Sequence, residues 1–487
     1  MKHTDIIQKL NLEQKCALLS GETVFTTRAL PGKGIPAITL SDGPNGVRKQ
    51  AGAADHLGLN PSVPATCFPT SSATACSWDE KLGEAVGEAL GEEAAAQEVA
   101  VLLGPGLNIQ RSPLCGRDFE YFSEDPILAG RMAAAYVRGI QKNGISACPK
   151  HFAVNSQELR RMASDSVLDE RTLRELYLTG FEIVVKEAKP KTIMTSYNLI
   201  NGTYANENAH LLQDILRKDW GFDGAVVTDW GGSNDHVLGV KNGSTLEMPC
   251  PGGDSIRELM KAVQGGKISE ADVDARLDEM LELVLSTHAA VEKAPRTFDA
   301  AAHHKLARRA AAESIVLLRN EGGILPLKPN EKLAVIGDFA ETPRYQGAGS
   351  SAVNALQVDT LLDCIKADDS GITLVGYASG FERQGAAGAE KLEEAVALAK
   401  KADTVLLCLG LDELRESEGL DRSDMKLAEN QQRLLAAVAA VNPNVVVLLS
   451  AGAPVETPWV GQCRALVYGA LGGQAGAGAA ADILTGR

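Results

Sequence analysis

The sequence predicts an α/β protein that consists of a (β/α) barrel followed by an α/β doubly wound sandwich domain. From about residue 5 to 290, short apolar segments alternate with long amphipathic helices, which is typical of a parallel sheet. A stretch around Ala294-Pro295-Arg296 interrupts this pattern, and a second alternation of strands and helices follows it. We therefore expect a TIM-like barrel over residues 1–290, a linker and connecting helix over 291–315, and the sandwich domain over 316–487.

The first part contains six apolar segments of strand length. These predicted strands lie near residues 37–40, 99–103, 145–148, 192–196, 225–228 and 245–248. Helical periodicity between and after them predicts helices over residues 79–97, 124–142, 170–187, 209–220 and 270–286. A regular barrel has eight strands. Because only six are predicted here, the barrel can be irregular.

The second part follows a predicted linker at 287–300 and an amphipathic helix at 301–314. Its predicted strands lie at residues 333–336, 372–375, 404–409, 445–449 and 465–468. Its predicted helices lie at residues 387–400, 427–441 and 474–484. Apolar strands that alternate with helices in this way predict a doubly wound sheet with helices on both faces.

Composition narrows the range of ligands. The formal net charge of -15 argues against a nucleic-acid partner, which requires a basic surface, and against a membrane partner of anionic lipid. Residues 1–10 lack the apolar core of a secretory signal, and the nine cysteines show no CxxC pair or Cys/His cluster, which favours buried reduced thiols. We expect a cytoplasmic location and a neutral small-molecule ligand. The cysteines are residues 16, 67, 76, 115, 148, 250, 364, 408 and 463.

An acidic residue follows the buried strand at 225–228. The run Asp229-Trp230-Gly231-Gly232 begins where a β/α barrel presents its chemistry, at the carboxyl end of a strand. A carboxylate there is costly for stability but useful for catalysis. An acid before two glycines is also a common helix cap or turn, so this position alone leaves both interpretations open.

Residues suited to a binding site end or follow three other predicted strands of the barrel. They are Asp42 and Arg48 after the first, Lys150 and His151 after the third, and Met194, Thr195, Ser196 and Tyr197 at the end of the fourth. A barrel brings these strand ends to one face, together with Asp229 and Trp230. This mixture of donors, acceptors and aromatic rings suits the hydroxyl groups and apolar face of a sugar. The alternative is that Arg48 and Lys150 neutralise Asp42 in a structural network.

A loop at residues 115–126 carries several charges and aromatic rings ahead of a predicted helix. Ser123, Asp125 and Pro126 are consistent with a helix start. Arg117 has no such role, and we expect it to point into the site.

These motifs resemble glycoside hydrolase family 3, in its β-glucosidase and β-xylosidase branch. The resemblance covers nearly the whole chain in the same order. The matching runs are residues 41–48, 116–126, 150–158, 194–198 and 227–230. The resemblance implies that Asp229 is the nucleophile and that the sugar subsite is formed by Asp42, Arg48, Arg117, Lys150, His151, Arg161, Met194, Tyr197 and Trp230.

The proton donor is expected from elsewhere in the chain. The family's N-acetylglucosaminidase branch takes it from a Gly- and His-rich loop after Lys-His-Phe, which residues 153–158 replace here. A retaining glycosidase needs a second carboxyl group, and the loop at 412–422 after a predicted strand offers several. On composition alone this loop also fits a solvated, charged turn. Its resemblance to the family's Glu-Gly-x-Asp-Arg signature selects Glu418 as acid/base, with Glu416 as the alternative. A loop at 347–351, with Ser350, resembles one that reaches over the sugar.

The resemblance implies a retaining exo-acting β-glycosidase, in the first place a β-glucosidase, that acts on a β-glycoside or oligosaccharide without a metal or organic cofactor. The alternatives are a β-xylosidase or other exo-glycosidase of the family, and a catalytically impaired carbohydrate-binding protein. A nucleotide-binding enzyme is disfavoured, because about ten residues separate Gly347-Ala348-Gly349 from the preceding strand.

The C-terminal end departs from the family pattern. Related enzymes continue past a stretch like residues 472–476 into a further strand, whereas this sequence stops at Arg487. We expect the second sheet to lack an edge strand, and an uncovered edge can pair with another chain, as in a homo-oligomer. A fragment, a strand supplied by a partner, and a fold that tolerates the loss all fit this pattern.

Overall fold

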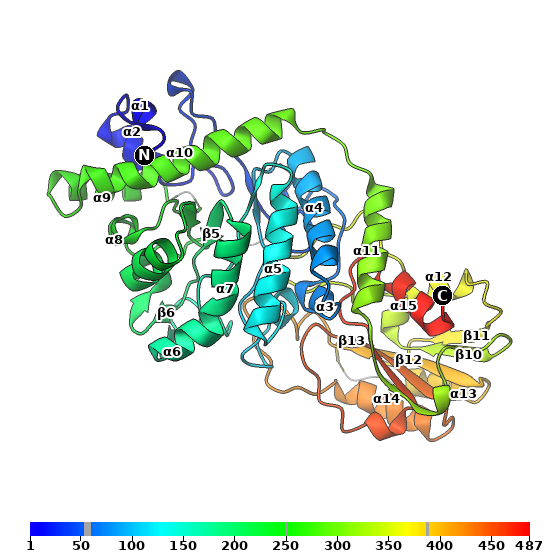
Figure 1. The fold of residues 1–487 in the computed structure, drawn as a ribbon. Helices are drawn as coiled ribbons and strands as arrows, with labels where there is room; N and C mark the ends of the chain where they lie inside the picture. Colours follow the sequence, from blue (N-terminus) through cyan, green and yellow to red (C-terminus); the bar gives the residue numbers. More distant parts are fainter. Residues whose placement is uncertain (53–59, 250, 386–388) are drawn as a thin grey trace. The chain divides into compact units, whose positions relative to one another are not determined.

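The computed structural model describes residues 1–52, 60–249, 251–385 and 389–487. The chain forms two compact units, each assembled from separate segments (Figure 1). Unit 1 comprises Met1–Ala65, Asp79–Arg111 and Tyr121–Asp299. Unit 2 comprises Thr66–Trp78, Ser112–Glu120 and Ala300–Arg487. Each unit has its own sheets.

Short parallel strands form the interior of unit 1. The strands β1 (Leu40–Asp42), β2 (Val101–Leu103) and β3 (Ser146–Ala147) form one parallel sheet, and β5 (Thr192–Met194) pairs in parallel with β8 (Ala225–Val227). Hydrogen bonds connect the two sheets, because Thr192 Oγ1 donates to Ala147 O and Met194 N donates to Pro149 O. The strands β2, β3, β5 and β8 are buried throughout, as their continuous apolar runs predict.

Two of the predicted strands in unit 1 differ from the structure. The strand predicted at 37–40 is displaced, so that Asp42 is the last residue of β1 and does not follow it. The strand predicted at 245–248 is wrong as a regular element. Its residues form single parallel bridges, Leu246 with Val227 and Glu247 with Ser20, because each neighbouring segment meets it over one residue pair only.

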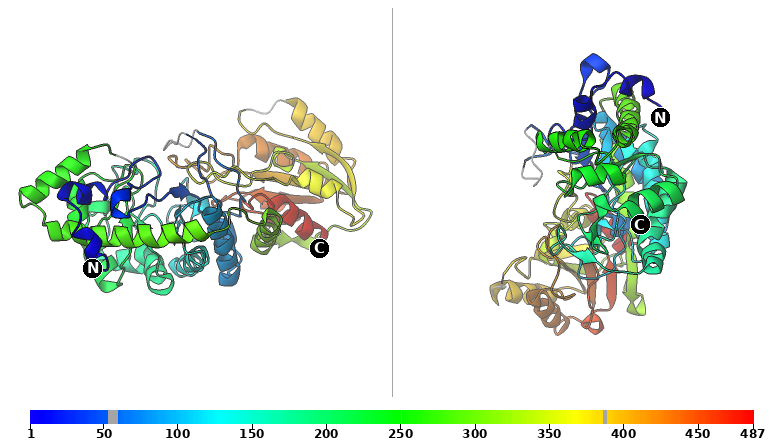
Figure 2. Two further views of the ribbon diagram at one scale, coloured as in Figure 1. Left: turned by 90° about the horizontal axis from the view of Figure 1, so that it is seen from above. Right: turned by 90° about the vertical axis from the view of Figure 1, so that its left-hand side faces the viewer.

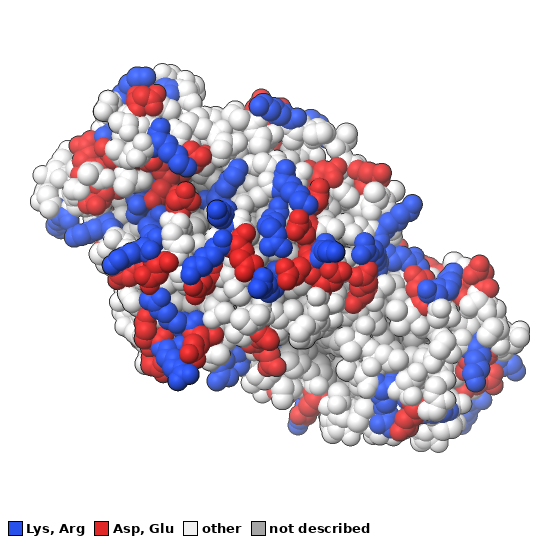
Figure 3. Space-filling view, viewed as in Figure 1, with Lys and Arg blue, Asp and Glu red and all other residues white. Residues whose placement is uncertain are grey.

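Helices α4 (Glu80–Ala96) and α5 (Pro126–Gln141) confirm the two helices predicted at 79–97 and 124–142. Each begins at an aspartate: the side chains of Asp79 and Asp125 accept hydrogen bonds from the first free backbone N–H groups of their helices. Their outer faces exchange ion pairs, and the face drawn in Figure 3 is a mosaic of both charge signs.

Other helices of unit 1 differ from the sequence prediction. The helix predicted at 170–187 is divided into α6 (Glu170–Thr172), α7 (Thr179–Ile183) and the π-helical segments η3 (Leu173–Leu178) and η4 (Val184–Ala188). The helix predicted at 209–220 is a π-helix, η6 (His210–Asp219). The helices not predicted in unit 1 are α1 (Thr4–Ile7), α2 (Leu12–Ala17), α8 (His236–Asn242) and α9 (Asp254–Gln264).

The linker predicted from residue 287 is wrong at its start. Helix α10 runs from Glu270 to Lys293, because its buried stripe continues through Thr287 and Val291. The N-terminal helices α1 and α2 pack along this helix (Figures 1 and 2). The connecting helix predicted at 301–314 is confirmed as α11 (Ala300–Ser314), which belongs to unit 2.

Unit 2 contains a six-stranded sheet in the order β11-β10-β12-β13-β14-β9. Its parallel strands are β10 (Lys332–Ile336), β11 (Thr373–Ala378), β12 (Thr404–Gly410), β13 (Val445–Ser450) and β14 (Ala465–Tyr468). All five were predicted within a few residues. The chain leaves β10 for one neighbour, β11, and returns to the other, β12, which is the reversal of a doubly wound sheet.

The sixth strand of this sheet was not predicted. Strand β9 (Val316–Asn320) lies at the edge and runs antiparallel to β14. Leu317 and Leu318 are 48% and 58% exposed, so the segment lacks the burial pattern of the central strands. Its sequence follows α11 without a turn signal, which is why it does not stand out from the preceding helix.

Helices cover both faces of this sheet (Figure 1). On one side α11, α12 (Leu361–Lys366) and α15 (Gly476–Thr485) pack together, and on the other α13 (Ala389–Ala399) packs against α14 (Glu429–Ala439). The helix predicted at 387–400 includes residues 387 and 388, which lie outside the described residues. The eight cysteines of the described ranges are free thiols, and Cys250 lies outside those ranges. Among the described residues, none of the helices combines the length and the hydropathy of a membrane span.

Two segments from the first half of the sequence belong to unit 2. The segment Thr66–Trp78 includes the buried helix α3 (Ser71–Ala75). Cys67 exchanges two hydrogen bonds with Gln474: its N–H donates to the Gln474 side chain at 3.0 Å, and its carbonyl accepts from Gln474 N at 2.8 Å. Gly473 has a φ of +68°, and a Cβ atom there would lie 2.5 Å from the Cys67 carbonyl oxygen.

This close approach predicts that Gly473→Ala destabilises the protein. The added methyl group meets rigid backbone and the residue must keep a left-handed conformation, so we expect the free energy of unfolding to fall by about 2 kcal/mol or more. Gly461→Ala is the matched control, because a Cβ there meets nothing within 4 Å. Urea denaturation followed by circular dichroism measures both variants. Equal stability of the two would contradict the role assigned to Gly473.

Candidate active site

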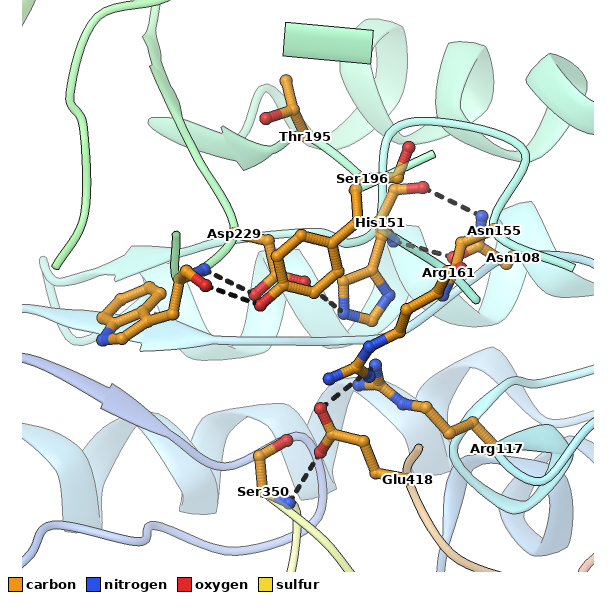
Figure 4. Close-up of polar contacts among 12 residues, drawn as sticks. Asn108, Arg117, His151, Asn155, Arg161, Thr195, Ser196, Asp229, Ser350 and Glu418 are labelled. Atoms are coloured by element: carbon orange, nitrogen blue, oxygen red, sulfur yellow. Dashed lines mark hydrogen bonds and ion pairs between the residues drawn. The ribbon is translucent and has the colours of Figure 1, made fainter. Parts of the chain in front are cut away.

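The predicted site residues fall into two sets, one in each unit. In unit 1 they are Asp42, Arg48, Lys150, His151, Arg161, Met194, Tyr197, Asp229 and Trp230. In unit 2 they are Arg117, Ser350, Glu416 and Glu418. Figure 4 shows members of both sets as sticks.

The unit 1 residues cluster where parallel strands end. Asp42 and Met194 are the last residues of β1 and β5, and Asp229 comes two residues after β8. Arg48 turns back to β1, where its N–H donates to the Asp42 carbonyl at 2.9 Å. Lys150 follows β3 and is 2% exposed. Because these strands are parallel and adjacent, their carboxyl ends carry the polar residues to one edge.

The Asp229 carboxyl group is the centre of the unit 1 set (Figure 4). Its side chain is 13% exposed, its Oδ1 accepts the backbone N–H of Trp230 at 2.7 Å, and its Oδ2 lies 3.6 Å from His151 Nε2. A backbone N–H donor favours the charged form of a carboxyl group. The Tyr197 hydroxyl donates to the Trp230 carbonyl at 2.8 Å, and the Arg161 guanidinium lies 4.9 Å from the centre of the Tyr197 ring.

The Trp230 indole has a fixed orientation. Its Nε1–H donates to the Val24 carbonyl at 2.7 Å, and the Phe25 ring lies 5.4 Å away at a tilt of 38°. The indole is half-buried, so part of it remains available for contact with another molecule. A ring fixed in this way can support the apolar face of a ligand.

Four residues around His151 were not identified from the sequence. Asn108 holds the His151 backbone, since its amide donates to the His151 carbonyl at 2.9 Å and its Oδ1 accepts from His151 N at 2.8 Å. Tyr121 OH lies 3.0 Å from His151 Nδ1, and Asn155 Nδ2 donates to Tyr121 OH at 3.0 Å. Asn155 also contacts Glu158. Asn108 follows β2, so the rule that found the other strand-end residues could have found it; Tyr121, Asn155 and Glu158 lie within the matching runs.

In unit 2 the Glu418 carboxyl group is fixed on two sides (Figure 4). Its Oε2 accepts the Ser350 backbone N–H at 2.8 Å, and its Oε1 lies 3.6 Å from Arg117 Nη1. Arg117 is 1% exposed and makes a bidentate pair with Glu120, with distances of 2.9 and 2.8 Å. Ser350 therefore contributes its backbone to this arrangement. The Glu418 side chain itself remains 18% exposed.

Glu416 has a different environment from Glu418. Its side chain is 1% exposed, its Oε1 accepts the Gly452 N–H at 2.7 Å, and its Oε2 lies 3.6 Å from Arg344 Nη2. Burial raises the pKa of the Glu416 carboxyl, although Arg344 and the Gly452 N–H act in the opposite direction. Burial likewise raises the pKa of the nearby Asp118 carboxyl. Glu416 is therefore an internal group of unit 2.

Comparison with known protein families finds a match in each half of the chain. Residues 49–283 match the glycosyl hydrolase family 3 N-terminal domain, and residues 315–487 match the C-terminal domain of the same family. The chain belongs to glycoside hydrolase family 3. The resemblance predicted from the sequence motifs is thereby confirmed.

Two relatives of this family 3 chain illustrate its similarity. It is 46% identical to thermostable beta-glucosidase B of Acetivibrio thermocellus over 99% of its own length and 64% of that protein. It is 43% identical to the exo-alpha-(1->6)-L-arabinopyranosidase of Bifidobacterium longum, again over 99% of its own length and 64% of the relative. The chain thus spans slightly less than two thirds of the length of these two relatives.

Solved structures show the same two-domain fold. The Bifidobacterium adolescentis GH3 beta-glucosidase superimposes with a TM-score of 0.93 at 42% identity, covering 99% of this chain and 69% of that one. Beta-glucosidase 3B from Thermotoga neapolitana, solved in complex with glucose, gives a TM-score of 0.90 at 33% identity, covering 100% of this chain and 74% of that one.

The burial of Glu416 predicts a specific pH dependence of stability. In the unfolded chain this carboxyl titrates near 4.5, whereas in the folded protein its pKa is higher. Between the two values the folded state binds more protons than the unfolded state, so this group's contribution to the free energy of unfolding falls as pH rises. We expect the stability of the wild type relative to Glu416→Gln to decrease as pH rises above about 4.5.

Urea denaturation across a series of pH values measures this difference. Glu394→Gln, on an exposed position of α13, is the control for loss of one negative charge. Parallel stability curves for the wild type and Glu416→Gln would contradict the internal role of Glu416.

Proposed function

We propose that the chain carries the activity of a retaining exo-acting β-glycosidase, in the first place a β-glucosidase, that removes terminal non-reducing sugars. The observation that carries this proposal is the Asp229 carboxyl group, held by the Trp230 N–H and facing the His151 ring at a strand end rich in buried donors. The beta-glucosidase relative and the glucose-bound neighbour support a sugar as the ligand.

The proposed reaction uses two carboxyl groups. Asp229 attacks the anomeric carbon and forms a covalent glycosyl-enzyme, while Glu418 gives a proton to the departing glycosidic oxygen. Glu418 then accepts a proton from water, which releases the sugar with its configuration retained. The Ser350 N–H and the Arg117 guanidinium stabilise the anionic form that Glu418 takes after proton donation.

The remaining predicted residues are proposed to bind the sugar. Charged and polar side chains would hydrogen-bond its hydroxyl groups, and the half-buried Trp230 indole would support its apolar face. The proposed binding residues are Asp42, Arg48, Arg117, Lys150, His151, Arg161, Met194, Tyr197, Trp230 and Ser350. Arg48 and Lys150 add positive charge on the side of the site where Asp42 and Asp229 lie.

A second candidate sugar is an arabinopyranose or xylose. The arabinopyranosidase relative favours this alternative, because the arabinopyranose in its name lacks the hydroxymethyl group of glucose. Initial rates with nitrophenyl β-glucoside, β-xyloside, β-galactoside and α-L-arabinopyranoside rank the candidates. Sugar binding without turnover of any of them would favour a carbohydrate-binding protein.

The closure of the unit 1 strands into a barrel is also a proposal. We infer that unit 1 closes as a TIM-like barrel, supported by hydrogen bonds that run from β1 through β5 and β8 to Ser20 and by the Leu40 N–H that donates to Phe25 O. The boundaries at 1–290, 291–315 and 316–487 stay predictions. So do the cytoplasmic location and the homo-oligomer.

Loss of the nucleophile gives the first test of function. Asp229→Asn keeps the shape of the side chain but removes its charge, so we expect turnover of a nitrophenyl β-glucoside to fall by more than about 10⁴-fold. Asp223→Asn is the matched control, because Asp223 is exposed at the opposite end of β8. A 2-fluoroglucoside should label wild-type Asp229, as detected by mass spectrometry of peptides. Full activity of Asp229→Asn would refute its role.

Loss of the acid/base gives the second test. Glu418→Gln should slow turnover by about 10²- to 10⁴-fold. Azide should restore the rate and yield a β-glycosyl azide, since it attacks the glycosyl-enzyme without base assistance. Glu416→Gln should show no such rescue. Azide rescue of Glu416→Gln in place of Glu418→Gln would reverse the assignment.

A further inference from the structure

A continuous series of buried polar contacts extends away from Asp229 within unit 1. His151 Nε2 lies 3.6 Å from Asp229 Oδ2, and His151 Nδ1 lies 3.0 Å from Tyr121 OH. Asn155 Nδ2 donates to Tyr121 OH at 3.0 Å. Tyr121, His151 and Asn155 are 1%, 2% and 3% exposed. The proposed nucleophile is therefore connected to a phenol through one imidazole ring.

Contacts to its backbone and to its imidazole fix the position of His151. Asn108 makes two hydrogen bonds to the His151 backbone, at 2.9 and 2.8 Å. The Tyr121 ring packs edge-on against the imidazole, with centres 6.1 Å apart and planes at 78°. Tyr121 is itself fixed, since its carbonyl accepts from the Gln110 side chain at 2.9 Å. The ring is thus held with Nε2 toward Asp229 and Nδ1 toward the phenol.

The contacts of the phenol bear on which imidazole nitrogen carries the proton. A phenol has one hydrogen to donate and an oxygen that accepts. The Asn155 amide donates to this oxygen, and His151 Nδ1 lies 3.0 Å from it, within reach of the phenol hydrogen. A neutral imidazole that accepts at Nδ1 carries its hydrogen on Nε2. That hydrogen is the one directed to Asp229, whose carboxylate can only accept.

Asn155 is held in turn by charged residues. Its amide lies 3.4 Å from Glu158 Oε1, and Glu158 Oε2 accepts from Arg161 Nη1 at 2.7 Å. Glu158 is 2% exposed. This ion pair orients the amide so that its NH₂ group faces the phenol.

We propose that Tyr121 is a positioning residue that holds His151 as a neutral Nε2–H donor to the nucleophile, with Asn155 orienting the phenol. This inference rests on the proposed role of Asp229 as nucleophile. Without the phenol hydroxyl, the imidazole hydrogen can move to Nδ1. Nε2 would then present a lone pair to the Asp229 carboxylate and destabilise its charged form.

The consequence for activity is a change in pH dependence. Among the charged and titratable groups around the pair are Lys150, which precedes His151, and Glu158 and Arg161 beyond Asn155. Cys148 lies within the field of Lys150 and Asp229, and burial raises the pKa of its thiol to about 12, so it stays neutral. Loss of the Nε2–H donor leaves Asp229 easier to protonate. The acidic limb of the pH profile should therefore move to higher pH.

Tyr121→Phe in the full chain tests the proposal, because it removes one hydroxyl and keeps the ring. In protein labelled with ¹⁵N-histidine, ring nitrogen shifts distinguish a protonated from a bare nitrogen, and His151→Gln assigns the signals among the eight histidines. At neutral pH we expect wild-type His151 to have a bare Nδ1 and a protonated Nε2, and Tyr121→Phe to show a mixture. We also expect the acidic limb of kcat/KM to rise by about one pH unit.

Tyr136→Phe is the control, since it removes a hydroxyl from another buried tyrosine, on α5. It should leave the His151 signals and the pH profile unchanged. A wild-type His151 protonated on Nδ1 would overturn the proposal even if Tyr121→Phe did not fold. An unchanged tautomer and pH profile in folded Tyr121→Phe would also overturn it. The nitrogen shifts need no turnover, so a folded protein with the expected tautomer and no glycosidase activity would contradict only the proposed function.

Discussion

The structure of unit 1 depends on holding a carboxyl group where little solvent reaches it. Asp229 follows a fully buried strand and keeps 13% of its side chain exposed. Withdrawing a carboxylate from water is costly unless donors replace the lost hydration. The Trp230 N–H does so on one oxygen of Asp229, and the His151 ring lies 3.6 Å from the other. The parallel strands around β8 are the means by which residues distant in sequence deliver these donors to one edge.

In unit 2 a buried arginine lies beside the proposed acid/base carboxyl group. Arg117 is almost fully buried and is held by two parallel hydrogen bonds to Glu120, which leaves its remaining nitrogen toward Glu418. The guanidinium is thus rigid before any ligand arrives. The second buried pair, Arg344 with Glu416, lies beneath the same loop and joins it to Gly452. Charge pairs fix this loop, and of its two glutamates at 416 and 418 it is Glu418 that keeps the more exposed side chain, 18% against 1%.

Much of the fold could be predicted because its signals are local. Apolar runs identified five parallel strands of each part to within a few residues, apart from the irregular segment at 245–248. The strand β9 could not be found in this way, since its partner is the distant β14 and its leucines are half-exposed. The rule that polar residues gather at strand ends was enough to identify Asp42, His151 and Asp229, because each lies within a few residues of an apolar run.

The residues that sequence reasoning missed act through contacts that only the fold creates. Asn108 and Tyr121 meet His151 across separations of 43 and 30 residues. For the same reason the sequence could not separate Glu416 from Glu418, which are two residues apart in one charged loop. Burial of one and partial exposure of the other follow from the packing of residues 344 and 452 around them.

The interleaving of segments has a consequence for the evolution and engineering of this chain. A single cut near residue 300 would not yield two self-sufficient halves, because Cys67 bonds Gln474 and the Gly116 N–H donates to the Asp421 side chain. A C-terminal piece would lose the backbone partners of its own glutamine and aspartate, together with Arg117. Gene shuffling that replaces the C-terminal half by that of a homologue must therefore keep residues 66–78 and 112–120 compatible with it. Otherwise these two segments must be transferred together with that half.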